Sequence, residues 1–350
     1  MRIVTLGKAR DAAAASDFRQ QLAYGSLLLP LALIAISLLL GLYEIRVETV
    51  AKALLSLVVP QAAEGISSTE LTLILRIRLP RVLSAALIGA ALASTGAAFQ
   101  GIFKNPLVDS NLLGVTSGAG FGAALALLLG GTALMVQGFA FGFGLLAVMV
   151  AYAGSRLYSS APLIVLTLMG ILIGSFFTSL TALTKYVADP LNTLPAITFW
   201  LLGGLTGVTW SSLPLLALIT LSGSAFMWAV RWRLNILSLG DAEALALGMN
   251  PTRLKLLIIL CATLMTAAAV AVGGVIGWIG LVIPHAARLL VGTDHKRLVP
   301  MSLALGASFL LVIDNISRTL LPAEVPLGIL TGLVGVPILI VLLRRSQTVW

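Results

Sequence analysis

Long apolar runs separated by short polar stretches dominate this chain of 350 residues. A helix that spans a membrane needs about 20 mostly apolar residues, and ten segments meet that requirement. They lie at residues 22–42, 82–103, 112–131, 134–155, 163–183, 210–230, 254–273, 276–292, 299–320 and 325–343. The first is too long for a signal-peptide core, so it is expected to remain as a helix. The pattern predicts an all-α, polytopic membrane protein with a single transmembrane domain over residues 1–350.

Composition agrees with a membrane protein. The chain is 59% hydrophobic and 10% charged, whereas a soluble domain carries about 25% charged residues. A formal charge of +9 would suggest a nucleic-acid partner in a soluble protein, but here lysines and arginines that anchor helix ends at the membrane explain it. We expect membrane lipid and no nucleic acid as a partner.

The distribution of basic residues predicts the orientation. If residues 1–21 form a cytoplasmic tail, 15 of the 22 lysines and arginines lie on the cytoplasmic side and 7 on the outer side, so both termini are expected to be cytoplasmic. Three of the seven exceptions are Arg76, Arg78 and Arg81 in the sequence RIRLPR, in which Pro80 is expected to fix the start of the second helix. A departure from the usual bias suggests that these arginines have a function.

Glycine and charge describe the interior of the bundle. Among 34 glycines, five pairs have a four-residue spacing that predicts tight helix packing: Gly118/Gly122, Gly138/Gly142, Gly170/Gly174, Gly273/Gly277 and Gly328/Gly332. Lys185, Asp189 and Asp314 fall near outer helix ends, and no acidic residue lies at the middle of a segment. Because carriers driven by protons or sodium usually need ionisable groups at that depth, a secondary transporter is disfavoured.

Two outer segments are too short to span the membrane and too apolar for ordinary loops. They are residues 194–205 and residues 322–327. Short helices buried at a pore mouth would explain both, since irregular backbone at membrane depth needs a protein or cavity lining. An interfacial loop that places Trp200 among the headgroups is the alternative for the first segment.

A polar interruption on the cytoplasmic side, residues 235–252, predicts a helix of less than two turns. Asp241 is a candidate N-cap, Glu243 lies in the first turn, and Gly248 can end the helix. Asn250 and Pro251 then provide a cap and a first-turn proline for the next spanning helix. So short a helix is not stable alone, so the segment is either a tight turn or a surface that docks on a partner.

Catalytic motifs are absent from the sequence. There is no G-x-x-x-x-G-K-[ST] phosphate loop, so the chain is not expected to hydrolyse ATP. His285 and His295 are its two histidines, too few for bis-histidine haems and without a zinc pattern, which disfavours a membrane-bound redox enzyme. We therefore expect no catalytic residue, no metal site and no cofactor on this chain.

Three stretches together resemble the FecCD-like permeases of ABC importers for iron chelates and cobalamin. They are RLPRVLSAALIGAALASTGAAFQGIFKNPLVDSNLLGVTSGAG (78–120), GWIGLVIPHAARLLVGTDHKRLVP (277–300) and AEVPLGILTGLVGVPILIVLL (323–343). The resemblance covers almost all of the chain after residue 70. It implies ten helices with inverted repeats in the type II ABC importer permease fold. It also implies a second permease copy or a paired homologous permease, two separate ATPase subunits that bind ATP and Mg²⁺, and an outer substrate-binding protein.

The resemblance also assigns residues to roles. Docking of the binding protein falls on Arg78, Arg81 and Arg318, of which Arg78 and Arg318 resemble arginines that pair with its glutamates. Coupling to the ATPase falls on the segment 235–252, with the basic turn Asp294–Arg297 on the same face. The coupling residues are Leu239, Gly240, Asp241, Ala242, Glu243, Leu245 and Gly248, and the candidate cytoplasmic gate is Tyr158, Ser159 and Ser160.

The sequence thus predicts an ATP-driven permease of a bacterial inner membrane that imports a metal chelate. A ferric siderophore is the favoured cargo because such cargoes are frequent in the family. Cobalamin, haem and molybdate remain alternatives, because no residue distinguishes them.

Overall fold

The computed structural model describes Gly25, residues 28–157 and residues 162–346, and these ranges contain helices but no β-strand. Within them, seven helices are long and apolar enough to cross a membrane, and three shorter apolar helices accompany them, namely Leu28–Leu39, Val115–Leu128 and Ile279–Val291. The ten follow the order of the ten predicted segments. The predicted all-α membrane fold is therefore confirmed.

The helix bounds differ from the predicted ones by several residues. After the first helix, Leu28–Leu39, the elements are α2 Val47–Leu55, α3 Ser68–Leu71, α4 Leu79–Phe103, α5 Val115–Leu128, α6 Ala133–Ser155, α7 Pro162–Val187, α8 Thr193–Leu201, α9 Leu213–Leu239, α10 Asp241–Ala246, α11 Pro251–Gly273, α12 Ile279–Val291, α13 His295–Thr319 and α14 Leu327–Ser346. The end of α9 at Leu239 and the start of α13 at His295 lie beyond the predicted boundaries. Apolar content marks the part of a helix that crosses lipid, not its polar extension.

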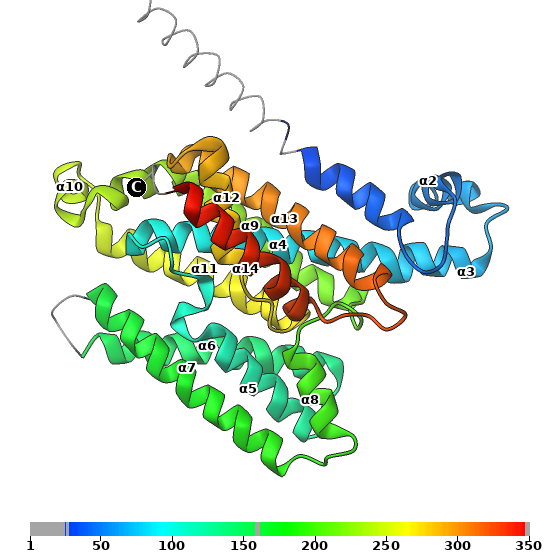
Figure 1. Cartoon of the computed structure of the whole chain (residues 1–350), viewed down its shortest axis with the longest axis horizontal. Helices are drawn as coiled ribbons and strands as arrows, with labels where there is room; N and C mark the ends of the chain where they lie inside the picture. The colour runs from blue at the N-terminus through cyan, green and yellow to red at the C-terminus, as the bar shows by residue number, and fades with distance from the viewer. Residues whose placement is uncertain (1–24, 26–27, 158–161, 347–350) are drawn as a thin grey trace, which may run out of the picture.

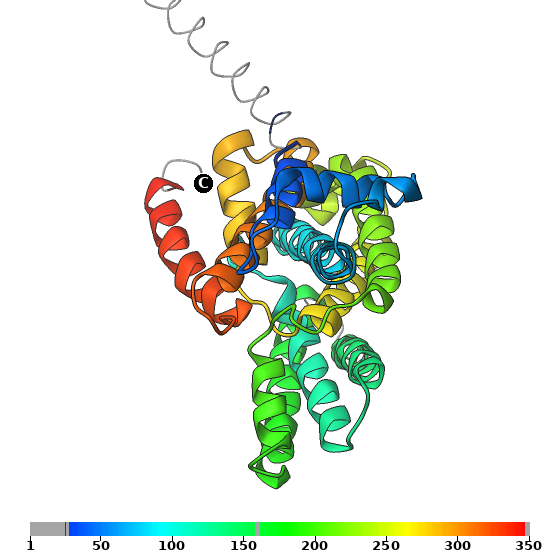
Figure 2. The ribbon, with the colours of Figure 1, turned by 90° about the vertical axis from the view of Figure 1, so that its right-hand side faces the viewer.

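The helix α4 lies in the middle of one group of helices and packs against α9, α11, α12 and α13 (Figure 1). A second group, made of α5, α6 and α7, packs together and contacts α11. It lies below the first group in both views (Figure 2). The end that carries α2 is the outer end in the predicted orientation, and the end that carries α10 is the cytoplasmic end.

Glycine allows the close approach of α4 to its neighbours. A Cβ atom at Gly89 would overlap the carbonyl oxygen of Gly306 on α13, and one at Gly96 would overlap the backbone of Gly280 on α12. Small residues at such positions let two helix backbones pack directly. Neither contact follows from a four-residue spacing, because its two glycines are on different helices.

The predicted glycine pairs have different outcomes. Gly118 and Gly122 are confirmed, since a Cβ atom at either would overlap the backbone of α6. For Gly138 and Gly142 the prediction is wrong within the described chain, because no atom lies within 4 Å of an added Cβ. In the other three pairs one glycine is in close contact: Gly170, Gly273 and Gly328.

Pro80 does not begin a helix as predicted, because one continuous helical segment runs from Ser68 to Phe103. Its residues Thr72–Arg78 form π-helical turns directly before α4. Proline has no N–H to donate, so the carbonyl of Leu75, five residues before Pro80, lacks a π-helical donor. The indole Nε1 of Trp210 donates to that carbonyl at 2.8 Å. The wider turns and this side-chain donor together let the helix pass through the proline.

The two short outer segments also differ in outcome. The first forms the helix α8, as predicted. The second, residues 322–327, is irregular chain until Leu327, so a helix there is wrong. Its backbone is satisfied by other segments: Leu327 N–H donates to the Gly203 carbonyl at 2.9 Å, and Val325 N–H donates to the Ser317 carbonyl at 3.3 Å. These bonds bring the segment to the outer end of α13.

Candidate docking and coupling surfaces

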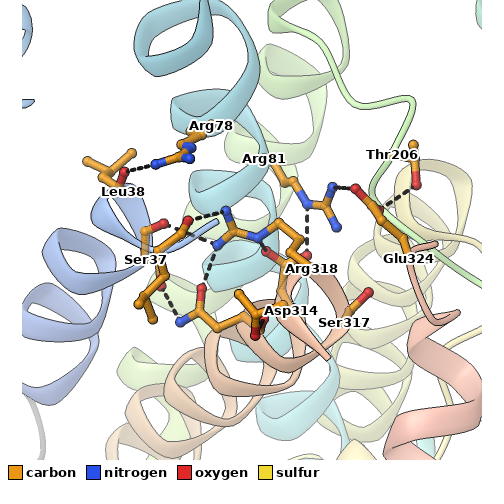
Figure 3. Close-up of polar contacts among 12 residues, drawn as sticks. Ser37, Leu38, Arg78, Arg81, Thr206, Asp314, Ser317, Arg318 and Glu324 are labelled. Carbon is orange, nitrogen blue, oxygen red and sulfur yellow. Dashed lines mark hydrogen bonds and ion pairs between the residues drawn. The ribbon is translucent and has the colours of Figure 1, made fainter. Parts of the chain in front are cut away.

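The three predicted docking arginines lie together at the α2 end of the bundle (Figure 3). Arg78 precedes α4, Arg81 is in its first turn, and Arg318 is in the last turn of α13. Their exposed fractions are 4%, 5% and 7%. All three side chains are therefore buried within this chain.

Arg78 binds carbonyl groups at the end of the first helix and just after it. Its guanidinium donates to the carbonyl oxygens of Leu38 at 2.8 Å, Leu39 at 3.1 Å and Tyr43 at 2.6 Å. The last carbonyls of a helix lack intrahelical donors, so an arginine can stabilise them. Arg78 thus fixes the end of the first helix against α4.

Arg81 and Arg318 share one buried carboxylate. Asp314 has no exposed surface, and its Oδ1 accepts a hydrogen bond from Arg81 Nε at 2.9 Å. Its Oδ2 forms an ion pair with Arg318 Nε at 3.1 Å. Arg318 also donates to the carbonyl of Ser37 at 3.1 Å, and Arg81 donates to Glu324 at 2.7 Å. The cluster joins the first helix, α4, α13 and the segment that follows α13.

Glu324 closes the cluster toward the surface. Its Oε1 is bonded to Arg81, and its Oε2 accepts a hydrogen bond from the Thr206 hydroxyl at 2.9 Å. Burial alone would raise the pKa of this carboxyl, but the hydrogen bond and charge of Arg81, the Thr206 hydroxyl and the charge of Arg318 hold its pKa below the ordinary value. Glu324 is therefore ionised at neutral pH.

The cluster pairs Arg81 and Arg318 with two carboxylates inside the chain. Docking of a binding protein on these arginines stays a prediction, and a direct ion pair with them would first have to displace these partners. The sequence analysis missed the roles of Asp314 and Glu324. The role of Asp314 could have been predicted, because Asp314 lies four residues before Arg318 and so on the same face of one helix, where the two can form an ion pair.

At the opposite end, α10 has the predicted length but a different start. Its N-cap is Gly240, in extended backbone, so the prediction that Asp241 caps the helix is wrong. The Asp241 carboxylate instead accepts a hydrogen bond from Lys255 Nζ at 2.5 Å. The predicted end is confirmed: Gly248 has φ +75°, its N–H donates to the Leu245 carbonyl, and the next N–H donates to Ala244. These two bonds form a Schellman motif.

Apolar side chains on the short helix and directly beside it are exposed. Leu239, Leu245 and Leu247 are 65%, 61% and 62% exposed, and Ala242 and Glu243 are exposed beside them. The helix is held by Ala244, which is fully buried, and by Lys104 Nζ, which donates to the Leu239 carbonyl at 2.9 Å. A fixed helix with exposed leucines beyond the apolar spans is suited to protein contact.

A polar network connects this segment to the turn before α13. The side-chain oxygen of Asn235 accepts from His295 N–H at 2.8 Å, and its amide nitrogen donates to Asp294 at 2.6 Å. The pKa of Asp294 is lowered although burial would raise it, because Asn235, the Lys296 N–H and the charges of Lys296 and Arg297 favour the carboxylate. The turn therefore lies beside the coupling segment, as expected, and the sequence analysis missed the role of Asn235.

The two histidines have structural contacts. His285 Nδ1 lies 2.9 Å from the Leu281 carbonyl, and His295 Nδ1 lies 2.9 Å from Asn235 Oδ1. Among the residues that the structure describes, no three side chains of His, Cys, Asp or Glu are grouped as a metal site would require.

The candidate gate residues Tyr158, Ser159 and Ser160 lie outside the described residues. Further along α7, a groove of about 590 Å³ lies along its contact with the start of α5, and Leu112 and Ile171 form part of its lining. Hydroxyl and amide side chains line it: Asn111, Ser117, Ser175, Thr178 and Ser179. The groove gives an otherwise apolar spanning helix a polar strip.

Known proteins support the assignment of these surfaces to a transporter. The sequence model of the FecCD transport family matches residues 28–345. The molybdate import system permease protein of Haemophilus influenzae is 37% identical over 95% of this chain and 97% of its own length. A protein of Helicobacter pylori named as a probable iron chelatin transport system permease is 41% identical over 82% of this chain and 86% of its own.

A solved structure has the same fold. It is described as a metal-chelate type ABC transporter in an inward-facing conformation, and it superposes with a TM-score of 0.82 at 36% identity, covering 93% of this chain and 99% of that one. The family match extends over nearly the whole chain, through every spanning helix described above. The chain belongs to the FecCD transport family and is a transmembrane permease of the ABC type.

Proposed function

We propose that two copies of this chain form the membrane pathway of an ATP-driven importer in a bacterial inner membrane. The importer carries a ferric siderophore from the outside to the cytoplasm. Two ATPase subunits act at the α10 end, and a substrate-binding protein delivers the cargo at the α2 end. The chain moves the cargo without changing it chemically.

The exposed leucines on and beside α10 are the observation that carries this proposal. Leu245 and Leu247 expose most of their surface outside the apolar spans, and so does Leu239, the last residue of the span Trp210–Leu239. Apolar surface is stabilised when it is removed from water, and a helix of six residues keeps its place here through Ala244, Lys104 and Lys255. Such a surface fits an ATPase subunit, because the chain has no phosphate loop of its own.

The hydroxyl-lined groove supports a hydrophilic cargo. Thr178 and Ser179 donate their hydroxyl hydrogens to the carbonyls of Gly174 at 2.9 Å and Ser175 at 3.1 Å. Their oxygens remain available as acceptors on the exposed side of α7. A metal chelate with polar groups on its surface can bond such a strip, whereas an apolar cargo gains nothing from it.

Molybdate is the second candidate cargo. The relative from Haemophilus influenzae is named for molybdate import and matches 97% of its own length. A hydrated oxyanion would also suit hydroxyl groups. The iron chelatin relative has the higher identity over a shorter match, so both cargoes need a direct comparison.

Docking of the binding protein is assigned to the surface that Arg78, Arg81 and Arg318 support. Because the three guanidinium groups are buried, we propose that they act indirectly. They fix the positions of the first helix and residues 320–326, which form the docking surface. The salt dependence of docking tests this. Direct ion pairs predict docking that weakens steeply as salt rises, whereas support from buried arginines predicts little change.

Isolation of the complex tests the proposed function. The full chain, cross-linked in its native membrane and purified, should carry an ATPase with a phosphate loop and an outer binding protein. Metal analysis of that binding protein should find iron in a chelate. Molybdenum in place of iron would establish the second candidate, and a chain isolated with neither protein would contradict the importer.

A further inference from the structure

A pocket at the α10 end combines a charged rim with an apolar lining. Its volume is about 420 Å³, and it lies where the ends of α6 and α7 meet α10 and the first turns of α11. These helix ends lie together at the left of Figure 1. It shares Asp241 with the coupling residues and no residue with the hydroxyl-lined groove. The residues that line it are Tyr152, Ser155, Arg156, Leu163, Leu166, Asp241, Thr252, Lys255, Leu256 and Ile259.

The rim has an excess of positive charge. Arg156 is exposed, and its guanidinium has no hydrogen bond or ion pair to any described residue. Lys255 is buried, with 11% of its side chain exposed, and its partner among the described residues is Asp241, whose side chain is 56% exposed. An ammonium group has three donors, and Asp241 accepts one. Two cations against one carboxylate can therefore bind an anion.

The lining shows what kind of anion fits. Leu163, Leu166, Leu256 and Ile259 form the apolar part of the pocket, and Leu163 and Leu256 are partly exposed in it. A small inorganic anion would make no contact with the apolar part of the pocket, and an apolar molecule would leave Arg156 without an anionic partner among the described residues. The matching ligand has an anionic head and a hydrocarbon chain.

A membrane lipid has both parts and is present at this depth. The pocket lies at the ends of α6 and α11, which are long and apolar enough to span the bilayer. Basic pockets between spanning helices on the cytoplasmic side are typical lipid-headgroup sites. We propose that this pocket binds one anionic phospholipid of the cytoplasmic leaflet, with its phosphate between Arg156 and Lys255 and an acyl chain along the leucines.

The bound lipid would also affect α10. Asp241 belongs to this helix, and Lys255 would bind both its carboxylate and the lipid phosphate. An occupied pocket therefore fixes the start of α10 on α11. This inference goes beyond the proposed function and does not depend on which cargo is carried.

Native mass spectrometry of the full chain tests the proposal. The chain is mixed with phosphatidylglycerol or with phosphatidylethanolamine of the same acyl chains, and the retained lipid is counted. One phosphatidylglycerol per chain should be retained in preference to phosphatidylethanolamine. Arg156→Gln should weaken that retention about fivefold, the effect of one cation near an anionic headgroup. Arg253→Gln, an exposed residue outside the pocket, should not.

Lys255 gives a second comparison that keeps the result independent of folding. Lys255→Arg preserves the charge and should retain the lipid, whereas Lys255→Met should lose it. Equal retention by the parent chain, Arg156→Gln and Lys255→Met would overturn the proposal. Equal retention of both lipids would also overturn it, as would a site that inorganic phosphate occupies while phosphatidylglycerol is not retained.

Discussion

Asp314→Asn should strongly destabilise the permease at its α2 end. The carboxylate has a side-chain exposure of 1% and lies between two guanidinium groups that are 6% and 8% exposed, those of Arg81 and Arg318. Asparagine preserves the shape but removes the charge, so Arg81 keeps its ion pair with Glu324 and Arg318 is left with no ion pair to a described residue. Breaking a buried ion pair in this way costs about 3–5 kcal/mol. For a chain of this size, that lowers the apparent Tm by on the order of 10 °C.

The assay is thermal unfolding of the purified full chain in detergent, followed by loss of the monodisperse peak in size-exclusion chromatography. Glu64→Gln is the matched control, since Glu64 is an exposed carboxylate in the same outer region. Its apparent Tm should equal that of the parent chain. If Asp314→Asn has the same apparent Tm as Glu64→Gln, the ion pairs of Arg81, Asp314 and Arg318 do not hold the outer end together.

Three further predictions concern packing, coupling and pH. Gly96→Val should prevent stable folding, because its Cβ atom would overlap the backbone of α12, whereas Gly138→Val, which meets no atom of the described residues within 4 Å, should express and unfold like the parent chain. Glu243→Arg combined with Leu245→Arg should abolish ATP-dependent uptake while the isolated permease keeps its apparent Tm, since both residues are exposed on α10; unchanged uptake would remove α10 as the coupling surface. Glu324 has a folded pKa below its ordinary value of 4.5, so its contribution to stability is present above that value and is lost as the pH falls through the lower folded pKa. Glu324→Gln should therefore lower the apparent Tm by the equivalent of about 1 kcal/mol at neutral pH, and the difference from the parent chain should shrink in acid.

The spanning helices could be predicted because lipid imposes a simple rule. A segment that crosses the bilayer must be long, apolar and helical, and the segments that became α6, α7 and α11 meet that rule in the sequence alone. The end of α10 was also predictable, since Gly248 adopts the left-handed conformation that glycine favours. Both signals are local in sequence.

The burial of the outer arginines could not be predicted in the same way. A count of basic residues by loop gives the side of the membrane but not the direction in which a guanidinium points. Arg81 finds its carboxylate 233 residues later, in Asp314, and Arg78 binds carbonyl groups about 35 to 40 residues earlier. Such partners become visible only when the helices are packed.

Glycine spacing likewise does not show which residues on other helices a glycine will contact. Gly118/Gly122 and Gly138/Gly142 have identical spacing, yet only the first pair meets a neighbouring backbone within the described chain. The contacts that bring α4 closest to α12 and α13 use single glycines, Gly96 and Gly89. Which glycine face is buried depends on the arrangement of whole helices. The spacing identifies candidates and the fold selects among them.

Uptake into proteoliposomes tests ATP-driven import most directly. The permease is reconstituted with its ATPase inside and its loaded binding protein outside, and uptake of the ferric siderophore is followed by its iron. Uptake should require ATP, persist when proton and sodium gradients are collapsed, and disappear when Glu243 and Leu245 are both changed to arginine. Uptake that follows an ion gradient and proceeds without ATP would contradict the account.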